Sequence, residues 1–345
     1  MAASHTRFLT CPPELYEEAL GVLYQRVPES LRPQLIAEVL QEAARGQVDL
    51  RGLWIARPAD WRLRLGPSPR REVVGALMTQ VLAGRAVAVW APEVLPGWGR
   101  TFTAAALVRA ALADFRSRGM RLAQAVLDES ANPHAASDLA RGGMPRVTEL
   151  LYLERDTRTP LIIKSPARGR AAAHARPASE PTSAVHPPVL AWRSYESTSQ
   201  EEFRRCLQAT YVASLDMPEL DCVRTLDEIL EGHRAAGRFT PRWWQLGQVP
   251  GEPAAAVVLL LAALPQRNAW EVVYLGLTPE ARGRGLGHTA IAHALELARP
   301  HTSSLELAVD VRNHPALRLY ESAGFSCFDR RSVHLVVFPG ESTTR

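Results

Sequence analysis

Lysine is almost absent from this chain of 345 residues. Its lysine and arginine side chains number 40, of which only Lys164 is a lysine, and they stand against 36 acidic ones. The net charge of +4 is small and the arginines are dispersed, so we expect no field strong enough to attract a polyanion. The preference for arginine indicates a genome rich in arginine codons, typical of bacteria, and we expect no nucleic-acid partner.

Cysteine and long apolar runs are also scarce. The four cysteines are far apart and form no CxxC pair, which fits neither a zinc site nor a disulfide framework, so we expect no metal and a reducing compartment. The longest uninterrupted apolar run, from Ala254 to Leu264, is too short to cross a membrane. Because "MAASHTRFLT" at the amino terminus also lacks the features of a secretory signal, we expect a cytoplasmic protein with no membrane partner.

Residues 157–188 differ in composition from the rest of the chain. They contain six prolines and five basic residues but one acidic residue, Glu180. Such a stretch cannot form an apolar core, so we expect an extended, mobile, Pro/Ala/Arg-rich linker. It divides the chain into two predicted domains, residues 1–156 and 189–345.

The two halves resemble each other. Each contains an asparagine followed eleven residues later by a glycine, Asn132 to Gly143 and Asn313 to Gly324. Upstream, "VWAPEVLPGWGRTFTAAALVRAAL" is similar to "LGLTPEARGRGLGHTAIAHALELA", each giving a strand, a Pro-Glu pair, a Gly-x-Gly corner and a long helix. This self-similarity predicts a duplicated domain.

The order of apolar patterns predicts an α/β (α+β layered) fold, in which each half has a mixed central sheet flanked by helices. In the second half we expect strands at 189–196, 242–248, 254–264, 270–277, 304–310, 325–329 and 333–338, and helices at 199–214, 225–237, 286–299 and 314–322.

The corner "TPEARGRGLGHTA" carries the clearest functional signal. Glycines at 283, 285 and 287 allow positive φ angles and bring backbone N–H groups together at the start of a helix, where they suit a pyrophosphate. A plain turn would explain one glycine rather than three. A dinucleotide fingerprint is also open, since Gly285, Gly287 and Ala290 satisfy G-x-G-x-x-A, but these glycines do not follow directly on the strand.

A third interpretation accounts for more of the sequence. "ARGRGLG" resembles the acetyl-CoA loop of the Gcn5-related N-acetyltransferase (GNAT) family, with Arg282, Gly285 and Gly287 at the matching positions. Before it, "YLGLTP" occupies the place of the family's cofactor strand, and after it "VRNHPALRLYESAGF" resembles the family's Asn-containing helix with its tyrosine, followed by Gly-Phe. A tandem pair of such domains is similar in architecture to mycothiol synthase.

The resemblance implies transfer of an acetyl group from acetyl-CoA to a primary amine, on a small molecule or a peptide, by direct attack in a ternary complex. It also implies the following cofactor-binding residues: Leu275, Gly276, Leu277, Arg282, Gly283, Arg284, Gly285, Leu286, Gly287, Asn313 and Ala316.

Two residues are expected to act in catalysis. Tyr320 matches the family's tyrosine, which donates a proton or a hydrogen bond to the leaving sulfur; alone, it would be interpreted as a core aromatic. Glu271 resembles the general base of one branch of the family, with a solvated charge as the alternative. Strand alternation would place Glu271 on the same face as Val273, Leu275 and Leu277.

Two further features concern the reacting groups. An unpaired backbone N–H of Leu275 or Leu277 would stabilise the developing oxyanion. Asp216, Glu219 and Asp221 would attract a cationic acceptor or form a solvated loop.

The first half lacks part of this pattern. Aligning the two corners places Val94 opposite Arg282, Gly97 opposite Gly285 and Gly99 opposite Gly287, and Pro96 removes an N–H donor. Leu139 stands where the second half has its tyrosine. We therefore predict a degenerate, catalytically silent first half.

A non-catalytic acyl-CoA-binding regulatory module is the main alternative function. It would use the same loop as a sensor and would have no need of Tyr320, so the tyrosine favours an enzyme.

Overall fold

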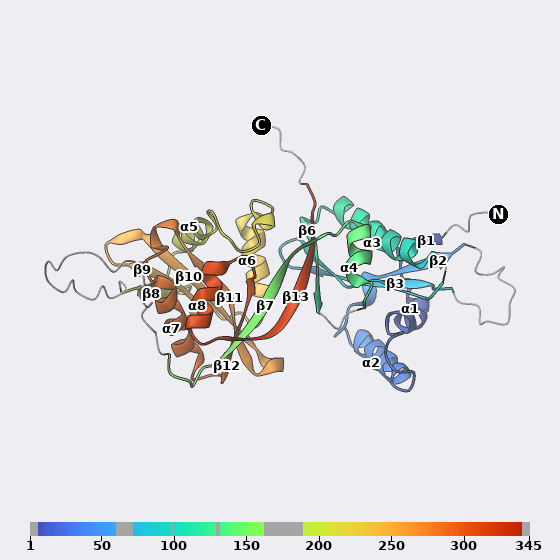
Figure 1. Cartoon of the computed structure of the whole chain (residues 1–345), viewed down its shortest axis with the longest axis horizontal. Coiled ribbons are helices and arrows are strands. Elements are labelled where there is room, and N and C mark those ends of the chain that lie inside the picture. Colours follow the sequence, from blue (N-terminus) through green and yellow to red (C-terminus); the bar gives the residue numbers. More distant parts are fainter. Residues whose placement is uncertain (1–5, 60–71, 98, 129–131, 162–188, 340–345) are drawn as a thin grey trace, which may run out of the picture. The chain divides into compact units, whose positions relative to one another are not determined.

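The computed structural model describes residues 6–59, 72–97, 99–128, 132–161 and 189–339 (Figure 1). The chain forms two compact units. The first unit comprises residues 1–150, 219–229 and 330–345, and the second comprises 151–218 and 230–329. Of the predicted linker at 157–188, only residues 157–161 lie among those described. These belong to the second unit, where the Thr157 hydroxyl donates to the Thr302 carbonyl at 2.6 Å.

The first unit is a sheet with helices on both faces. Its elements are β1 (Thr6–Thr10), α1 (Tyr16–Leu23), α2 (Arg32–Ala44), β2 (Leu53–Pro58), β3 (Gly75–Leu82), β4 (Ala86–Val89), β5 (Glu93–Val94), α3 (Arg100–Ser117), β6 (Leu122–Asp128), α4 (Ala135–Gly142) and the last part of β13 (Ser326–Val337). The strand order is β1-β2-β3-β4-β6-β13, and β4 and β6 run parallel. Alternate β2 residues pack against α1 or α3, which gives the layers.

The second unit has the same layered plan. Its elements are the last part of β7 (Arg146–Asp156), β8 (Ala191–Ser194), α5 (Gln200–Thr210), most of α6 (Leu226–Ala235), β9 (Trp244–Val249), β10 (Glu252–Leu264), β11 (Ala269–Leu277), α7 (Leu286–Ala298), β12 (Ser304–Asp310) and α8 (His314–Ser322). The strand order is β7-β12-β11-β10-β9-β8; β8 to β11 pair antiparallel and β11 pairs parallel with β12.

Amphipathic helices explain these layers. The buried face of α7 recurs at helical spacing, with Leu286, Ala290, Ile291, Ala294, Leu295 and Ala298 all inside. It packs with α8 on one face of the second sheet. On the other face α5 approaches β11, since the Thr210 hydroxyl at its end lies 2.8 Å from that of Tyr274. The predicted α/β layered class is confirmed.

The end strands of the two halves are exchanged between the units. Residues from Leu151 onward in β7 belong to the second unit, whereas the stretch from Arg331 to Val337 in β13 pairs antiparallel with β6 in the first. The predicted strands at 325–329 and 333–338 are one continuous strand, because the polar residues between them stay extended rather than turning.

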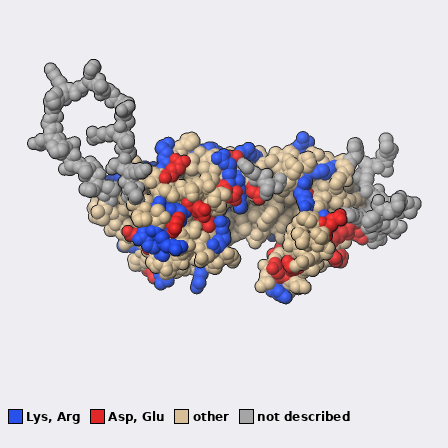
Figure 2. All heavy atoms as spheres, turned by 60° about the horizontal axis from the view of Figure 1, so that its bottom comes forward, with Lys and Arg blue, Asp and Glu red and all other residues tan. Residues whose placement is uncertain are grey.

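The surface carries mixed charge. Figure 2 shows blue arginines interspersed with red acidic side chains on the face in view. Within the described ranges, no helix is both long and apolar enough to cross a membrane.

Candidate functional site

The second unit contains a strand with one open edge. β11 and β12 pair only over three positions, from Ala269 with Ser304 to Glu271 with Glu306, although both strands continue beyond them. On its other edge β11 stays paired with β10 as far as Leu277. The residues of β11 after Glu271 therefore have backbone groups that no neighbouring strand satisfies, which is a suitable surface for a ligand.

Two N–H groups point to this open edge. The Thr278 amide donates to the carbonyl of Ala256 in β10 at 3.0 Å. Because alternate N–H groups of a strand point the same way, the amide of Gly276 also faces β10, whereas those of Leu275 and Leu277 face the open edge. The predicted cofactor strand thus has free donors at the two positions nominated for the oxyanion.

A β-bulge changes which side chains share a face. Leu260 pairs with Tyr274 and Leu261 pairs with Val272, so Val273 is an extra residue in β11. Tyr274 is therefore directed to the α5 side of the sheet, and Val272 packs into the core beneath α7.

The predicted face of Glu271 is wrong as a consequence. Uninterrupted alternation would have put Glu271 with Leu275 and Leu277, but both leucines pack on the α7 face. Glu271 pairs across the strands with Ala262 and shares the opposite face with Tyr274. This moves its carboxyl to the side of the sheet on which α5 lies.

The corner that follows β11 is built as the sequence predicted. After the short 3₁₀ helix Pro279–Ala281, Gly283 and Gly285 have φ angles of 72° and 79°, and Gly285 is the residue before α7. No described residue accepts a hydrogen bond from the amides of Gly283, Arg284 or Gly285. The first amides of α7, Leu286 among them, also lack partners within the helix. The corner thus presents a group of N–H donors.

Gly287 has a different role from its two neighbours. It lies in the first turn of α7, and a Cβ there would come within 2.9 Å of Leu319 Cδ2 in α8. Glycine at this position allows the two helices to pack closely.

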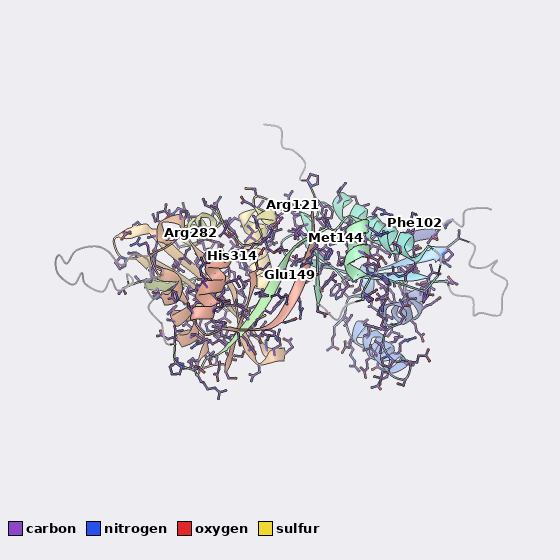
Figure 3. The ribbon with its side chains drawn as sticks, viewed as in Figure 1. Phe102, Arg121, Met144, Glu149, Arg282 and His314 are labelled. Carbon is purple, nitrogen blue, oxygen red and sulfur yellow. The ribbon has the colours of Figure 1, made fainter. Side chains whose placement is uncertain are left out.

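The side chain of Arg282, labelled in Figure 3, is bound to backbone carbonyls. Its guanidinium donates to the carbonyls of Leu277, Thr210, Val212 and Ala213 at 3.1, 3.1, 2.7 and 3.3 Å. It therefore joins the start of the corner to the segment that follows α5.

Arg284 is paired in a similar way. Its guanidinium contacts both carboxylate oxygens of Glu252 at 2.8 and 3.0 Å. With both arginines occupied, the backbone amides are the donors left for an anion.

α8 supplies Asn313, Ala316 and Tyr320. The Asn313 side chain caps the helix by accepting a hydrogen bond from the Ala316 amide at 3.3 Å. Tyr320 is 7% exposed and packs edge-on against Phe325. Burial, and then the charge of Asp216, raise the pKa of the Tyr320 hydroxyl. That hydroxyl has no hydrogen-bond partner among the described residues.

Glu271 lies beside a second carboxylate. Its neighbour in register on β12 is Glu306, which forms an ion pair with Arg267 at 3.1 Å. Burial, and then the charge of Glu306, raise the pKa of Glu271, while Arg267 opposes the shift.

The contacts of Asp216 could not be predicted from the sequence. Its carboxylate accepts a hydrogen bond from the Asp310 amide at 3.4 Å. Partial burial raises the pKa of Asp216, and the like charge of Asp310 acts in the same direction. By area the residue is exposed, which limits the size of the shift. An acidic loop is a common sequence feature, so only the contacts distinguish this carboxylate.

The corner of the first unit starts a helix too. Gly99, with φ 89°, is the residue before α3. By helix position it corresponds to Gly285, so the sequence alignment that matched Gly97 to Gly285 is displaced here. Leu139 is fully buried in α4 where the second unit has Tyr320.

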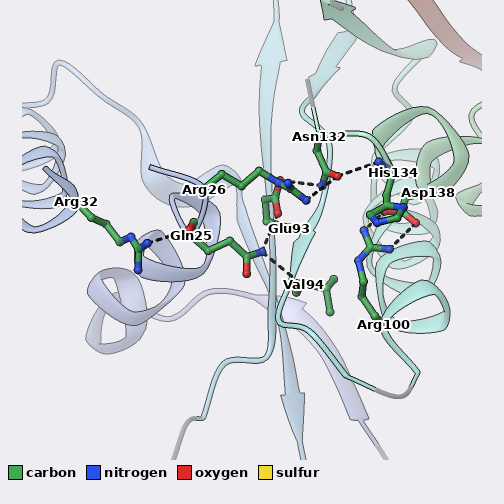
Figure 4. A network of polar contacts seen from close by, with 9 residues as sticks. All are labelled: Gln25, Arg26, Arg32, Glu93, Val94, Arg100, Asn132, His134 and Asp138. Atoms are coloured by element: carbon green, nitrogen blue, oxygen red, sulfur yellow. Dashed lines mark hydrogen bonds and ion pairs between the residues drawn. The ribbon is translucent and has the colours of Figure 1, made fainter. Parts of the chain in front are cut away.

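Polar side chains around the first corner satisfy one another (Figure 4). Arg100, in the first turn of α3, contacts the fully buried Asp138 at 3.1 and 2.5 Å. Nearby, Glu93 accepts hydrogen bonds from Gln25, Arg26 and Asn132 at 2.7 to 2.9 Å.

Comparison with known proteins agrees with this geometry. Residues 201–325 match the family model described as "Acetyltransferase (GNAT) family". This stretch is similar to GNAT domains. The predicted resemblance is thereby confirmed, and the expectation of an acyltransferase is supported at the level of the family.

Similar proteins extend the comparison. A mycothiol acetyltransferase of Corynebacterium kroppenstedtii is 37% identical over 67 residues, which span 19% of each chain. A GCN5-related N-acetyltransferase from Sphaerobacter thermophilus has a TM-score of 0.54 at 15% identity and covers 97% of this chain and 96% of its own. A glucosamine N-acetyltransferase region of a fungal multi-domain β-N-acetylglucosaminidase has a TM-score of 0.55 at 14% identity, over 97% of this chain and 38% of that one. The two structures show the fold alone, and the whole chain matches it.

Proposed function

We propose that the second unit transfers an acetyl group from acetyl-CoA to a primary amine by direct attack in a ternary complex. The observation that carries the proposal is the continuity of unsatisfied N–H donors. They run from Leu275 and Leu277 on the open edge of β11 to the amides from Gly283 to Gly285 at the start of α7.

This row of donors fits acetyl-CoA. The amides of the corner lie at the positive end of the α7 dipole, and the missing Cβ at Gly283 leaves open space for a pyrophosphate. The open edge would bind the amide groups of the pantetheine arm, as an added strand does. When bound, acetyl-CoA supplies the acetyl group as a thioester.

Tyr320 is proposed to act on the leaving sulfur. Because the pKa of its hydroxyl is raised, the group stays protonated at neutral pH. It therefore donates a hydrogen bond to the developing thiolate and keeps its own proton. The amide of Leu275 or Leu277 would stabilise the oxyanion, since both face the same edge.

Two carboxylates are candidates for the base. Glu271 and Asp216 both have a raised pKa, which brings each closer to the pH at which a base works well. Their surroundings differ, because Glu271 lies near the charges of Glu306 and Arg267, whereas Asp216 lies near those of Asp310 and Arg312.

The first unit is proposed to be a silent copy. Polar side chains near its corner, such as Arg100 with Asp138 and Asn132 with Glu93, bond to one another, and Leu139 replaces the tyrosine. We expect calorimetry with acetyl-CoA to give one site per chain. Two sites of equal affinity would contradict a silent first unit.

Replacing Gly283 by alanine tests the proposal, with Gly251→Ala as a matched control. Both glycines have positive φ angles, 72° and 82°, and open space where a Cβ would lie. Both variants should lose similar stability, about 1–2 kcal/mol for a left-handed residue. Only Gly283→Ala should weaken acetyl-CoA binding in calorimetry, because only that Cβ enters the donor group. Equal affinity in both variants would contradict the assigned site.

Thiol release from acetyl-CoA, measured against primary amines, tests the reaction itself. Release that depends on an amine supports the enzyme. Tight binding of acetyl-CoA with no release from any amine would favour the regulatory module instead.

A further inference from the structure

We propose that Asp216 binds the ammonium group of the acceptor and removes its proton, so that the acceptor is a cationic amine recognised by its charge. The inference rests on the proposed acetyl transfer and adds to it a base and a substrate class.

Asp216 is a carboxylate without a cation. It lies in the loop after α5 and contacts the amide of Asp310, the last residue of β12. Asp310 is fully buried, and its carboxylate is bound by the Arg312 guanidinium at 2.7 and 3.0 Å. No described arginine forms an ion pair with Asp216. The charge of Asp310 is thus neutralised within the protein, whereas that of Asp216 is left for a ligand.

Tyr320 is an independent sign of a ligand at the same place. It is more than nine-tenths buried, and within the part of the chain that the structure describes its hydroxyl has no partner. The hydroxyl oxygen is not among the fully buried polar atoms that lack a partner in the described residues, so water or a ligand can reach it. The charge of Asp216 acts on this hydroxyl, as it does on that of Tyr274. Asp216 contacts Asp310 at the end of β12, and α8, which carries Tyr320, begins at His314 shortly after it, so both groups are attached to the same end of β12.

The loop that carries Asp216 is fixed to the cofactor corner. Arg282 binds the carbonyls of Thr210, Val212 and Ala213, which immediately precede this loop. The same arginine binds Leu277 at the end of the open strand. The Arg282 side chain therefore fixes the position of the Asp216 loop, and of an amine bound to Asp216, relative to the glycine corner.

Glu271 has no such relation to Tyr320. The charges that act on it are those of Glu306 and Arg267. Asp216 is therefore the better placed of the two candidate bases.

The chemistry balances in protons and bonds. Asp216 accepts one proton from the ammonium, which frees the nitrogen lone pair to form the C–N bond to the acetyl carbon as the C–S bond breaks. The nitrogen loses a second proton to solvent, and the thiolate takes one from solvent to leave as the thiol. After Asp216 releases its proton, the sum is one amide, one thiol and one proton.

The groups that set the ionisation of Asp216 come from every side. The pKa of Asp216 depends on burial, on the amide and the charge of Asp310 and on the charge of Arg312, and the charge of Asp216 in turn raises the pKa of Tyr320 from α8 and of Tyr274 from β11. Only Arg312 carries positive charge, and it is bound to Asp310.

The test compares Asp216→Asn with the wild type in thiol release from acetyl-CoA. The probes are n-butylamine, ethanolamine, glucosamine and lysine methyl ester, each a cation at neutral pH, and methoxyamine, which is uncharged there. With the best of the four cations, Asp216→Asn should lower kcat/KM by about 100-fold or more, the usual effect of losing a general base. With methoxyamine, which has no proton to lose before attack, the loss should be under about 10-fold.

Controls separate the possible failures. Glu321→Gln, an exposed carboxylate change on α8, should leave every rate unchanged, and Asp216→Glu should recover part of the loss. Acetyl-CoA affinity by calorimetry should be the same in all variants, which shows that they fold. Equal losses of Asp216→Asn with methoxyamine and the cations, or no loss, would overturn the role of Asp216 while leaving the enzyme in place. Absence of release by the wild type with all five probes would overturn the acetyl transfer itself.

Discussion

The two helices that begin at a left-handed glycine, α3 at Gly99 and α7 at Gly285, differ in how their surroundings are satisfied. At α3, Arg100 is paired with the buried Asp138. At α7, the amides before the helix have no acceptor among the described residues, and Tyr320 behind it has none for its hydroxyl. The same backbone conformation at the start of a helix therefore occurs in two different chemical surroundings.

The difference separates structure from function. Gly283 and Gly285 are exposed, so water can satisfy the corner amides until a ligand replaces it, whereas an ion pair with a buried carboxylate holds the start of α3 in place without a ligand. We infer that the first corner retains the shape of the site and uses it for packing, while the second retains the shape for binding.

The largest effect should come from breaking the ion pair at the first corner. Asp138→Ala leaves Arg100 without its buried partner and should lower the free energy of unfolding of the first unit by about 3–5 kcal/mol. Denaturant unfolding, followed by probes in each unit, measures this. The double variant Arg100→Leu/Asp138→Leu replaces the ion pair with two apolar side chains and should recover most of the loss. If Asp138→Ala had the same free energy of unfolding as the wild type, the ion pair between Arg100 and Asp138 would not stabilise the first unit.

At the second corner, removing the hydroxyl of Tyr320 should slow turnover. Tyr320→Phe should reduce kcat about 100-fold, the lower end for losing a group that assists proton or hydrogen-bond transfer, because the leaving sulfur loses its donor. Acetyl-CoA affinity, measured by calorimetry, should change little. Tyr320→Leu copies Leu139 of the first unit and should be no more active. Full activity in Tyr320→Phe would remove the distinction between the two corners.

Sequence reasoning found the features that are local. The glycines at 283 and 285 require a backbone that few residues adopt, so their left-handed conformation was predictable, and so was the start of α7. Tyr320 was found through the spacing of its motif. Most strands and helices of the second half lie within a few residues of their predicted bounds, since their apolar periods are regular.

Features that depend on distant contacts were out of reach. The bulge at Val273 follows from pairing with β10, and it reversed the face of Glu271. Three of the four carbonyls that bind Arg282 come from much earlier in the chain, at separations of 69 to 72 residues. The exchange of end strands could not be predicted, because the pattern of apolar and polar residues in a strand does not specify the sheet in which the strand pairs.

Arg282 allows the comparison to be sharpened, since the first half has no arginine at the aligned position. Arg282→Ala removes four charge-assisted hydrogen bonds to carbonyls, and each such bond contributes about 1.5–3 kcal/mol when buried. Solvent reaches part of this side chain, so we expect a total loss of about 2 kcal/mol in thermal or denaturant unfolding. KM for the amine should rise more than KM for acetyl-CoA, because the loop with Asp216 loses its anchor. Arg284→Ala, which frees only Glu252, is the control for the loop and should leave KM for the amine unchanged.

The smallest effect concerns pH and again distinguishes a binding group from a structural one. The pKa of Asp216 is raised in the folded protein, so the folded state holds its proton to a higher pH than the unfolded chain does. Stability from this group is therefore present below the unfolded pKa of about 3.9 and declines as pH rises through the folded pKa. Asp216→Asn should remove that decline and be slightly more stable than the wild type at neutral pH, although less active. Thermal unfolding from about pH 3 to about pH 8, a range that begins below the unfolded pKa, measures the difference. If Asp216→Asn were instead destabilised at neutral pH, its carboxylate would be a structural group like that of Asp138, held by the protein and not reserved for a substrate.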